Sequence, residues 1–284
     1  MKKLLMWAAV VSLGVTSAQA QTRYLDEVFD EVNVTSDVVY GQNITVLTAL
    51  QGLPPAPEDL KMDIYEPVGD SETDRPLLLY FHTGNFLPPF VNGSPFGTKG
   101  DNTAVEICTR YAKKGYVVAS VDYRLGWNPL AATQIERTMQ LIQAAYRGVQ
   151  DSRTAVRYFR MTEAEEGDPY GIDPTKIGMI GEGTGAYITM ASATIESYND
   201  IILDDEGGAI SKFYYDPGTG QQIPMVIEGI HGDPDATSDG FAPASAGGFQ
   251  LCMANHVGYS SDFNFQMNMG GALGDLNWLD EGDM

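Results

Sequence analysis

Positively charged residues are scarce in this sequence. Its 284 residues include 17 lysines and arginines against 38 aspartates and glutamates, so the formal net charge is −21 at pH 7. A surface of this sign repels the phosphates of nucleic acids and of anionic membranes. The charge balance therefore argues against nucleic acid as a partner. It favours a globular protein with an ordinary core and an acidic, solubilising surface.

Long apolar runs are also missing, except at the N-terminus. There residues 4–15 form an apolar stretch behind a basic start, and a small-x-small cleavage signal ends at Ala20. This order of regions is typical of a secretory signal peptide, and the run is shorter than the roughly 20 apolar residues of a membrane span. We therefore expect residues 1–20 to be a signal peptide. Residues 21–284 should form a domain that is secreted, periplasmic or at the cell surface.

Cysteine and histidine are rare, with two and three residues in the whole chain. An exported protein could join Cys108 and Cys252 in a disulfide, but Cys108 lies in a predicted helix, where it fits equally well as a small buried hydrophobe. These residue types are not clustered, so a structural zinc site is not expected. Acidic clusters at residues 204–206 and 233–235 leave calcium as an alternative, although neither has EF-hand spacing. We expect no metal and no cofactor.

Apolar runs and amphipathic stretches alternate from residue 60 onward. Strands are expected over residues 60–65, 77–81, 116–121, 176–180 and 263–269, and helices over residues 103–114, 135–160 and 186–195. Alternation of this kind predicts a mostly parallel α/β sheet with helices on both faces. Thr103 and Glu106 have capping-box spacing at the start of the first helix. Residues 197–261 are the least regular part and are expected to form a lid-like excursion.

Three short motifs stand where predicted strands end. His82, Gly84 and Phe86 form a His-x-Gly-x-Phe sequence after one strand, and Tyr-Arg-Leu occupies residues 123–125 after the next. A third strand runs into a Gly-x-x-x-Gly turn at residues 181–185, and a helix follows. This last turn lacks the Lys-Ser/Thr of a phosphate-binding loop, and its glycines lack dinucleotide-binding spacing. Nucleotide binding is therefore not expected.

In this order and spacing, the motifs resemble the α/β-hydrolases of the carboxylesterase and lipase-like group, of the secreted bacterial type. In that group a His-Gly-Gly-x-Phe loop supplies oxyanion-hole N–H groups, and a Gly-x-Ser-x-Gly elbow carries the nucleophile. Residues 147–151 and 170–174 also resemble the family's long helix and its approach to the elbow. The resemblance covers about residues 60–193. It implies an α/β-hydrolase fold and hydrolysis of carboxylic esters.

The resemblance also implies a role for each residue of the two loops. The backbone N–H groups of Gly84 and Thr184 would form the oxyanion hole, which stabilises the charge that develops in a tetrahedral intermediate. The implied binding residues are His82, Asn85 and Phe86, and the implied elbow residues are Gly181, Glu182 and Gly185, around position 183. Small flanking residues make such a sharp elbow sterically possible.

The nucleophile position holds Gly183 instead of serine. Glycine has no side chain, so no acyl-enzyme can form through it. One alternative is Thr184 as a shifted nucleophile, but it comes one residue late and the elbow would point it differently. Glu182 as a nucleophile or water-activating base is similarly disfavoured. We therefore expect catalysis to be impaired in this chain.

The acid and the histidine of this family follow two later strands. Residues 278–283 resemble the approach to the acid-bearing strand, and the sequence ends at Met284. His231 and His256 precede the last predicted strand, so they do not fit the catalytic role. We expect a fragment of a longer product that lacks the last strands of the sheet, with a natural short form as the alternative. Asp151, within the long helix, is expected to be structural.

Two functions are consistent with these expectations. The first is an esterase or lipase-like hydrolase of small-molecule esters, with impaired catalysis. The alternative is a non-catalytic ligand-binding or cell-surface protein on the same scaffold, in which Phe86, Phe90 and Phe96 would line a pocket for an apolar ligand. The fold alone does not decide between them, because function depends on the site.

Overall fold

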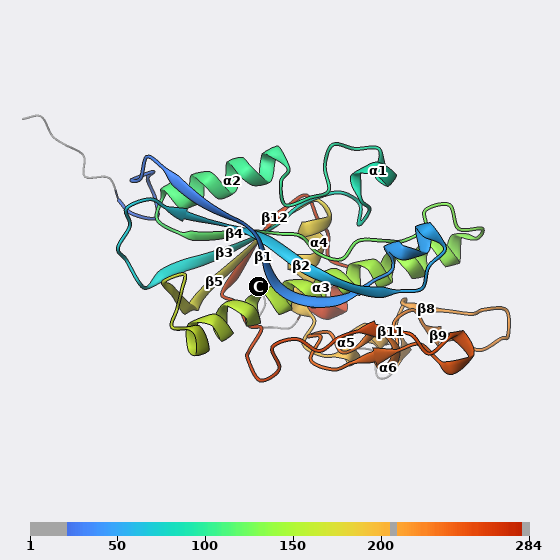
Figure 1. Cartoon of the computed structure of the whole chain (residues 1–284). Coiled ribbons are helices and arrows are strands. Elements are labelled where there is room, and N and C mark those ends of the chain that lie inside the picture. The colour runs from blue at the N-terminus through green and yellow to red at the C-terminus, as the bar shows by residue number, and fades with distance from the viewer. Residues whose placement is uncertain (1–21, 205–208, 280–284) are drawn as a thin grey trace, which may run out of the picture.

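The computed structural model describes residues 22–204 and 209–279 of the chain. The predicted signal peptide, residues 1–20, lies outside the described residues. Within them, no helix is both long enough and apolar enough to cross a membrane. Figure 1 shows one central sheet with helices packed on both of its faces.

Among the described residues, six strands form the central sheet. They are β1 (Val32–Thr45), β2 (Ala56–Pro67), β3 (Arg75–Phe81), β4 (Val117–Val121), β5 (Ile172–Glu182) and β12 (Phe265–Met269). They lie side by side in the order β1-β2-β4-β3-β5-β12. Strands β4, β3, β5 and β12 pair in parallel, whereas β1 and β2 are antiparallel additions at one edge. The expected mostly parallel sheet is therefore confirmed, and β1 is a strand that the sequence pattern did not indicate.

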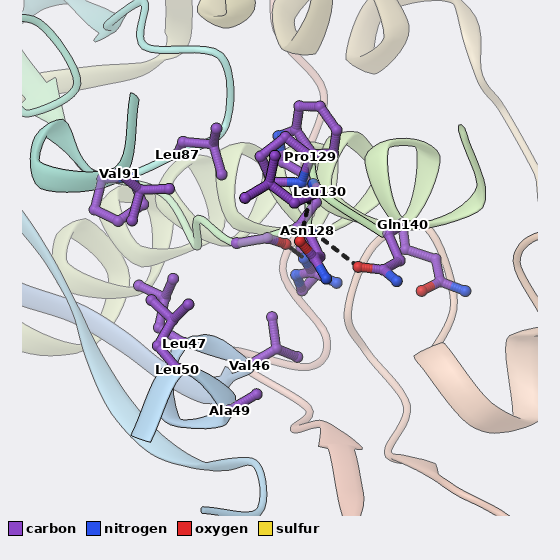
Figure 2. Close-up of a pocket in the computed structure, with 15 residues that line it drawn as sticks. Val46, Leu47, Ala49, Leu50, Leu87, Val91, Asn128, Pro129, Leu130 and Gln140 are labelled. Carbon is purple, nitrogen blue, oxygen red and sulfur yellow. Dashed lines mark hydrogen bonds between the residues drawn. The ribbon is translucent and has the colours of Figure 1, made fainter. Parts of the chain in front are cut away.

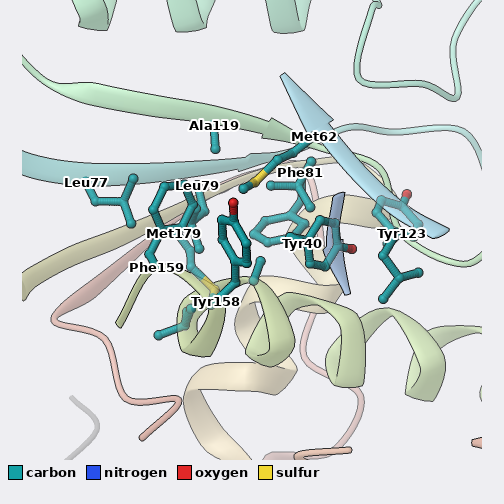
Figure 3. Close-up of a cluster of buried hydrophobic side chains, with 14 of the residues drawn as sticks. Tyr40, Met62, Leu77, Leu79, Phe81, Ala119, Tyr123, Tyr158, Phe159 and Met179 are labelled. Atoms are coloured by element: carbon teal, nitrogen blue, oxygen red, sulfur yellow. The ribbon is translucent and has the colours of Figure 1, made fainter. Parts of the chain in front are cut away.

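Strand β3 lies at the middle of the sheet and is buried on both faces. Leu77, Leu79 and Phe81 pack into the core on one face, and Leu78 and Tyr80 pack into the core on the other. Because side chains alternate along a strand, only a continuous apolar run can satisfy both faces. Figure 3 shows the first of these two cores between the sheet and a long helix.

Helices cover both faces of the sheet. The principal ones are α2 (Asn102–Lys113), α3 (Gln134–Glu166) and α4 (Thr184–Thr194). Helix α2 buries Ala104, Cys108 and Ala112 against the face that carries Tyr80, and α3 and α4 pack on the opposite face. A capping box between Thr133 and Glu136 fixes the start of α3, since each side chain satisfies a backbone N–H that has no helical partner.

The predicted start of α2 is wrong. The helix begins after Asp101, and no capping box forms between Thr103 and Glu106. The Asp101 carboxylate instead accepts hydrogen bonds from the backbone N–H groups of Gly97 and Thr98. It therefore secures the loop that precedes the helix, and Glu106 pairs with an exposed arginine one turn later.

Within residues 197–261, the described part of the chain contains only short elements. They are α5 (Tyr198–Ile202), β6 (Leu203–Asp204), β7 (Ala209–Ile210), β8 (Tyr214–Tyr215), β9 (Ile223–Pro224), α6 (Glu228–His231), β10 (Gly240–Phe241), η2 (Ala244–Ala246) and β11 (Gln250–Cys252). In Figure 1 this segment lies on the side of α3 that faces away from the sheet. Side chains of α3 donate to its backbone: Tyr146 Oη to Gly232 at 2.8 Å and Gln143 Nε2 to the carbonyl of Met225 at 2.9 Å. The long helix therefore supports both the sheet and this outer segment.

The remaining short helices are η1 (Leu47–Gln51), α1 (Pro89–Asn92) and η3 (Leu276–Trp278). The two cysteines are buried free thiols. The carboxylate of Asp233 accepts hydrogen bonds from backbone N–H groups of its own turn. Asp235 forms an ion pair with Arg153. No group of metal-ligating side chains occurs in the part of the chain that is described.

A fully buried ion pair joins the end of β4 to the middle of α3. Asp151 accepts hydrogen bonds from the backbone N–H and from Nε of Arg124, at 2.7 and 2.9 Å. The same guanidinium donates to the side-chain oxygens of Asn43 and Gln150, both at 2.9 Å. Asp151 is thus structural, as expected, and it fixes the loop that follows β4 beside the candidate site.

Candidate active site

The turn between β5 and α4 has the backbone geometry of a nucleophile elbow. Gly183 is its central residue, with φ of 53° and ψ of −114°. L-residues rarely adopt this conformation, and a sharp strand-to-helix turn is what exposes a nucleophile in this fold. The N–H of Gly183 donates to the carbonyl of Met269 at 3.0 Å, so the end of β12 holds the turn in place.

The glycines on both sides of Gly183 are required by close backbone packing. A Cβ on Gly185 would lie 2.0 Å from the carbonyl oxygen of Phe81, at the end of the neighbouring strand. A Cβ on Gly181 would lie 2.5 Å from Cα of Ala186. Backbone atoms cannot yield as a flexible side chain can, so larger residues at these two positions would force the strand and the helix apart.

The space that a nucleophile side chain would occupy is filled by Thr83. A Cβ built on Gly183 would lie only 2.1 Å from Oγ1 of Thr83 and 2.9 Å from its Cβ. The sequence interpretation did not include Thr83 among the site residues. The signal that could have revealed it is a threonine directly after His82, where the resembled loop has glycine.

The loop after β3 turns sharply, and two of its residues have left-handed backbone conformations. Asn85 and Phe86 have positive φ values of 59° and 55°. The carbonyl of Asn85 accepts from Trp127 Nε1 at 2.8 Å, and the carbonyl of Gly84 accepts from Asn92 Nδ2 at 3.0 Å. A Cβ on Gly84 would collide with the backbone of another residue in the same loop. The missing side chain of Gly84 therefore allows the loop to pack closely against itself.

His82 lies beneath this loop and is almost fully buried. Its ring stacks on Tyr123 with 4.5 Å between centroids, and Nε2 is 3.3 Å from a carboxylate oxygen of Asp122. The hydroxyl of Tyr123 donates to the carbonyl of His82 at 2.8 Å and lies 3.1 Å from Oγ1 of Thr184. His82 therefore positions the loop from below, and Thr184 directs its hydroxyl to Tyr123.

None of the three histidines, all within the described residues, forms a hydrogen bond with the elbow. His231 interacts with the backbone of Ile227, and burial lowers its pKa to about 4, so it is neutral at pH 7. His256 Nε2 lies 2.7 Å from the carbonyl oxygen of Tyr40. The residues that the structure describes thus contain no histidine placed as a general base for position 183.

Glu182 has a partner of its own. One oxygen of its carboxylate accepts a hydrogen bond from the hydroxyl of Tyr80 at 2.6 Å, and burial, followed by this bond, raises the pKa of Tyr80 well above its usual value. Thr184 is the first residue of α4, and the N–H groups of a first helical turn have no intrahelical acceptor. An N–H donor beside the nucleophile position is therefore present without a nucleophile.

An apolar cavity of about 430 Å³ opens beside the elbow. Its walls come from the loop after β3, from α3 and α4, and from the outer segment, with Phe86, Trp127, Ala191, Phe213 and Trp278 among the lining residues and Thr184 at the elbow. This volume falls within the range of about 300–1,000 Å³ that is typical of small-molecule sites.

The expected aromatic lining is only partly right. Phe86 lies in the wall of this cavity, but Phe90 and Phe96 do not. They are 80% and 40% exposed. The aromatic rings that replace them come from distant segments, Trp127 before α3 and Trp278 in η3.

Glu58 in β2 lies near the buried pair of Arg124 and Asp151. Burial, and then the charge of Asp151, raise the pKa of Glu58 to about 7. An unfolded glutamate titrates near about 4.3. Between these two values the folded chain holds a proton that the unfolded chain has lost, so stability falls as the pH rises from about 4.3 to 7.

Glu58→Gln should flatten this pH dependence. We expect the variant to gain about 1–3 kcal/mol over the natural chain at pH 8, and to match it near pH 5. Urea unfolding at both pH values measures the difference. Glu27→Gln, at an exposed position, is the control. Parallel pH curves for the natural chain and Glu58→Gln would contradict the assigned pKa.

Comparison with known proteins agrees with this geometry. The BD-FAE family profile matches residues 62–227, which is more than half of the chain. No curated protein matches the chain. The match runs from β2 through the elbow and into the outer segment, so it includes both loops of the site.

Several solved esterases are similar to this chain over part of their length. Esterase 2 of Thermogutta terrifontis, in the form phosphoramylated by tabun, is 21% identical with a TM-score of 0.35, over 61% of this chain and 48% of that one. The hyperthermophilic esterase of Pyrobaculum calidifontis is 21% identical with a TM-score of 0.33, over 58% of this chain and 38% of that one. Brefeldin A esterase, described as a bacterial homologue of human hormone sensitive lipase, is 18% identical with a TM-score of 0.33, over 59% of this chain and 36% of that one. The chain thus spans less than half the length of these structures.

The family assignment rests on the profile match and on the fold that carries it. The sheet order, the loop after β3 and the elbow at Gly183 all lie inside or next to the matched region. The chain therefore belongs to the BD-FAE family, within the carboxylesterase and lipase-like group of α/β-hydrolases.

Proposed function

We propose that this chain binds an ester or another apolar small molecule in the cavity beside Gly183 without forming an acyl-enzyme there. The observation that carries the proposal is Thr83, whose side chain fills the space of a nucleophile that the chain lacks. A filled nucleophile position prevents covalent chemistry but leaves the apolar cavity and the N–H of Thr184 available. Binding without acyl transfer therefore fits the site better than ester hydrolysis through position 183.

Weak ester hydrolysis is the second candidate. Family membership favours it, and so does an elbow that retains an N–H donor at Thr184. Hydrolases whose catalytic residues have been removed keep roughly 10³–10⁴-fold acceleration from the oxyanion hole and from binding. Turnover at that level, with no covalent intermediate, would identify the chain as a weak ester hydrolase and not as a protein that only binds its ligand.

Tryptophan fluorescence should report occupancy of the cavity. Trp127 and Trp278 both line it, and the third tryptophan, Trp7, precedes the predicted mature domain. Titration of the chain from residue 21 onward with octyl acetate, a neutral ester, should change the emission saturably. Ala191→Phe, which fills the cavity, should weaken binding at least about tenfold, because the ligand and the new ring need the same space.

The control for this titration is Ala246→Phe, which adds the same ring at an exposed position in η2. It should bind octyl acetate as the natural chain does. The intact mass of the protein after incubation should also be unchanged. Binding that is indifferent to Ala191→Phe, or a mass increase equal to one acetyl group, would refute the proposed function.

We also propose that the protein is exported from the cytoplasm. Its support is the basic start, the apolar residues 4–15 and the cleavage signal that ends at Ala20. Mass analysis of the N-terminus after expression with an intact secretion system should identify Gln21 as the first residue. A retained Met1 in the exported fraction would contradict it.

A further inference from the structure

A second cavity lies between η1, the loop before α1 and the start of α3. Its volume is about 360 Å³, and Figure 2 shows apolar side chains from three separate segments around it. Leu47 and Leu50 come from η1, Leu87 and Val91 from the loop and α1, and Leu130 from the segment before α3. The cavity is separate from the elbow, although Trp127 contributes to the walls of both.

Arg147 of α3 is the one charged side chain in the lining of this apolar cavity. It is 8% exposed, and it donates to the carbonyl of Gly126. Its Nε is buried and has no hydrogen-bond partner among the described residues. The cavity therefore contains a buried cation with donor capacity that this part of the chain does not use.

The other buried arginines all have carboxylate partners. Within the described residues these pairs are Arg75 with Glu66, Arg124 with Asp151, and Arg153 and Arg157 with Asp235. No ion pair of this kind forms at Arg147 among residues 22–204 and 209–279. A buried charge is ordinarily paired, because removing it from water without a counter-charge costs several kcal/mol. Arg147 is thus the exception among the described residues: the charges of Asp151 and Glu58 act on it through space in the direction that raises its pKa, but neither forms an ion pair with it.

The charge on Arg147 persists at neutral pH. Burial, and then the neighbouring charge of Arg124, lower its pKa to about 10. A guanidinium with this pKa is almost fully protonated at pH 7. The polar amides of the lining are already engaged: Gln140 accepts from the N–H of Asn128 at 2.9 Å, and Gln143 donates to Met225.

We propose that this cavity is a binding site for a small amphipathic carboxylate. Its carboxylate would pair with the guanidinium of Arg147, and its hydrocarbon part would lie against Leu47, Leu87 and Trp127. One cation in an apolar enclosure matches one negative charge and an apolar body. A doubly charged phosphate would leave one charge uncompensated in the same enclosure, which disfavours it.

Isothermal titration calorimetry with octanoate tests the proposal. The natural chain should bind octanoate saturably, and it should bind 1-octanol, the neutral analogue of equal length, at least about tenfold more weakly. Arg147→Met should remove this preference, so that octanoate loses at least about tenfold in affinity while octanol is nearly unaffected. Arg110→Met, which breaks an exposed ion pair in α2, is the matched control and should change neither affinity.

Two further variants locate the site and guard against a folding defect in Arg147→Met. Ala49 is an exposed residue of η1 in the cavity lining, so Ala49→Trp should block octanoate without disturbing the core. Ala191→Phe fills only the elbow cavity and should leave octanoate binding unchanged. The proposal is overturned if octanoate does not bind, if octanol binds equally well, or if Ala191→Phe rather than Ala49→Trp abolishes octanoate binding.

Discussion

Gly183→Ser should destabilise the chain by about 2–4 kcal/mol for as long as Thr83 is present. Two costs add up in this variant. The new residue must adopt a φ of 53°, and its Cβ would lie 2.1 Å from Oγ1 of Thr83. In Gly183→Ser combined with Thr83→Gly the second cost disappears, so the double variant should recover about 1–3 kcal/mol. Urea unfolding of the two single variants and the double variant gives this coupling energy directly.

A matched control separates strain from overlap. Gly93 also has a positive φ, 68°, but a Cβ there would have no neighbour within 4 Å. Gly93→Ser should therefore show the cost of a left-handed residue without overlap, although Gly93 has a ψ of 16° and Gly183 one of −114°, and Thr83→Gly should not improve it. If Gly183→Ser is no less stable than Gly93→Ser, Thr83 does not fill the nucleophile position.

The same variants test catalysis. Neither the single nor the double serine variant should turn over p-nitrophenyl acetate quickly, because no histidine in the described residues is hydrogen-bonded to the elbow. Rapid turnover by the double variant would show that a base reaches position 183 from elsewhere. Rapid turnover by Gly183→Ser alone would show in addition that Thr83 moves aside readily.

Asp151→Asn should destabilise the chain by about 3–5 kcal/mol. The substitution removes the counter-charge of Arg124, whose side chain and that of Asp151 are both fully buried at an N–O distance of 2.8 Å. The remaining guanidinium cannot reach water, and its hydrogen bonds to Asn43 and Gln150 do not neutralise it. Chemical denaturation with circular dichroism measures the loss.

The double variant Arg124→Met with Asp151→Leu is the informative comparison. Removing both charges should cost less than removing one, because no unpaired ion is left in the core. Glu106→Gln breaks an exposed pair with Arg110 in α2 and should leave the unfolding midpoint nearly unchanged. A double variant as unstable as Asp151→Asn would mean that shape at this position matters more than charge.

The sequence predicted best where one local rule decides the structure. The short continuous apolar run of β3, followed by turn residues, favours a strand buried on both faces, and the glycines at 181 and 185 are needed where β5 turns sharply into α4. Strand β1 was missed because register shifts at residues 35–38 and 39–41 interrupt its alternation. Its place in the sheet depends on pairing with β2.

The site was predicted less completely than the fold, since its important contacts join distant segments. Thr83 and Gly183 are 100 positions apart, and neither residue alone indicates that one fills the space left by the other. Phe213 reaches the elbow cavity because the outer segment packs on α3, and Trp278 reaches it from η3, near the other end of the described chain. Phe90 was expected to line the pocket together with Phe86, but it is 80% exposed and is not among the residues that line the cavity.

The overlap between Thr83 and position 183 also determines the order in which a nucleophile could be acquired by mutation. A serine that appears first collides with the threonine, whereas Thr83→Gly as the first change only opens space. The two substitutions are therefore epistatic, and one of the two mutational paths passes through a poorly folded intermediate. Neither path by itself restores fast turnover, because no histidine in the described residues is hydrogen-bonded to the elbow. The glycine at the elbow is in this sense protected from replacement by serine through a residue in another loop.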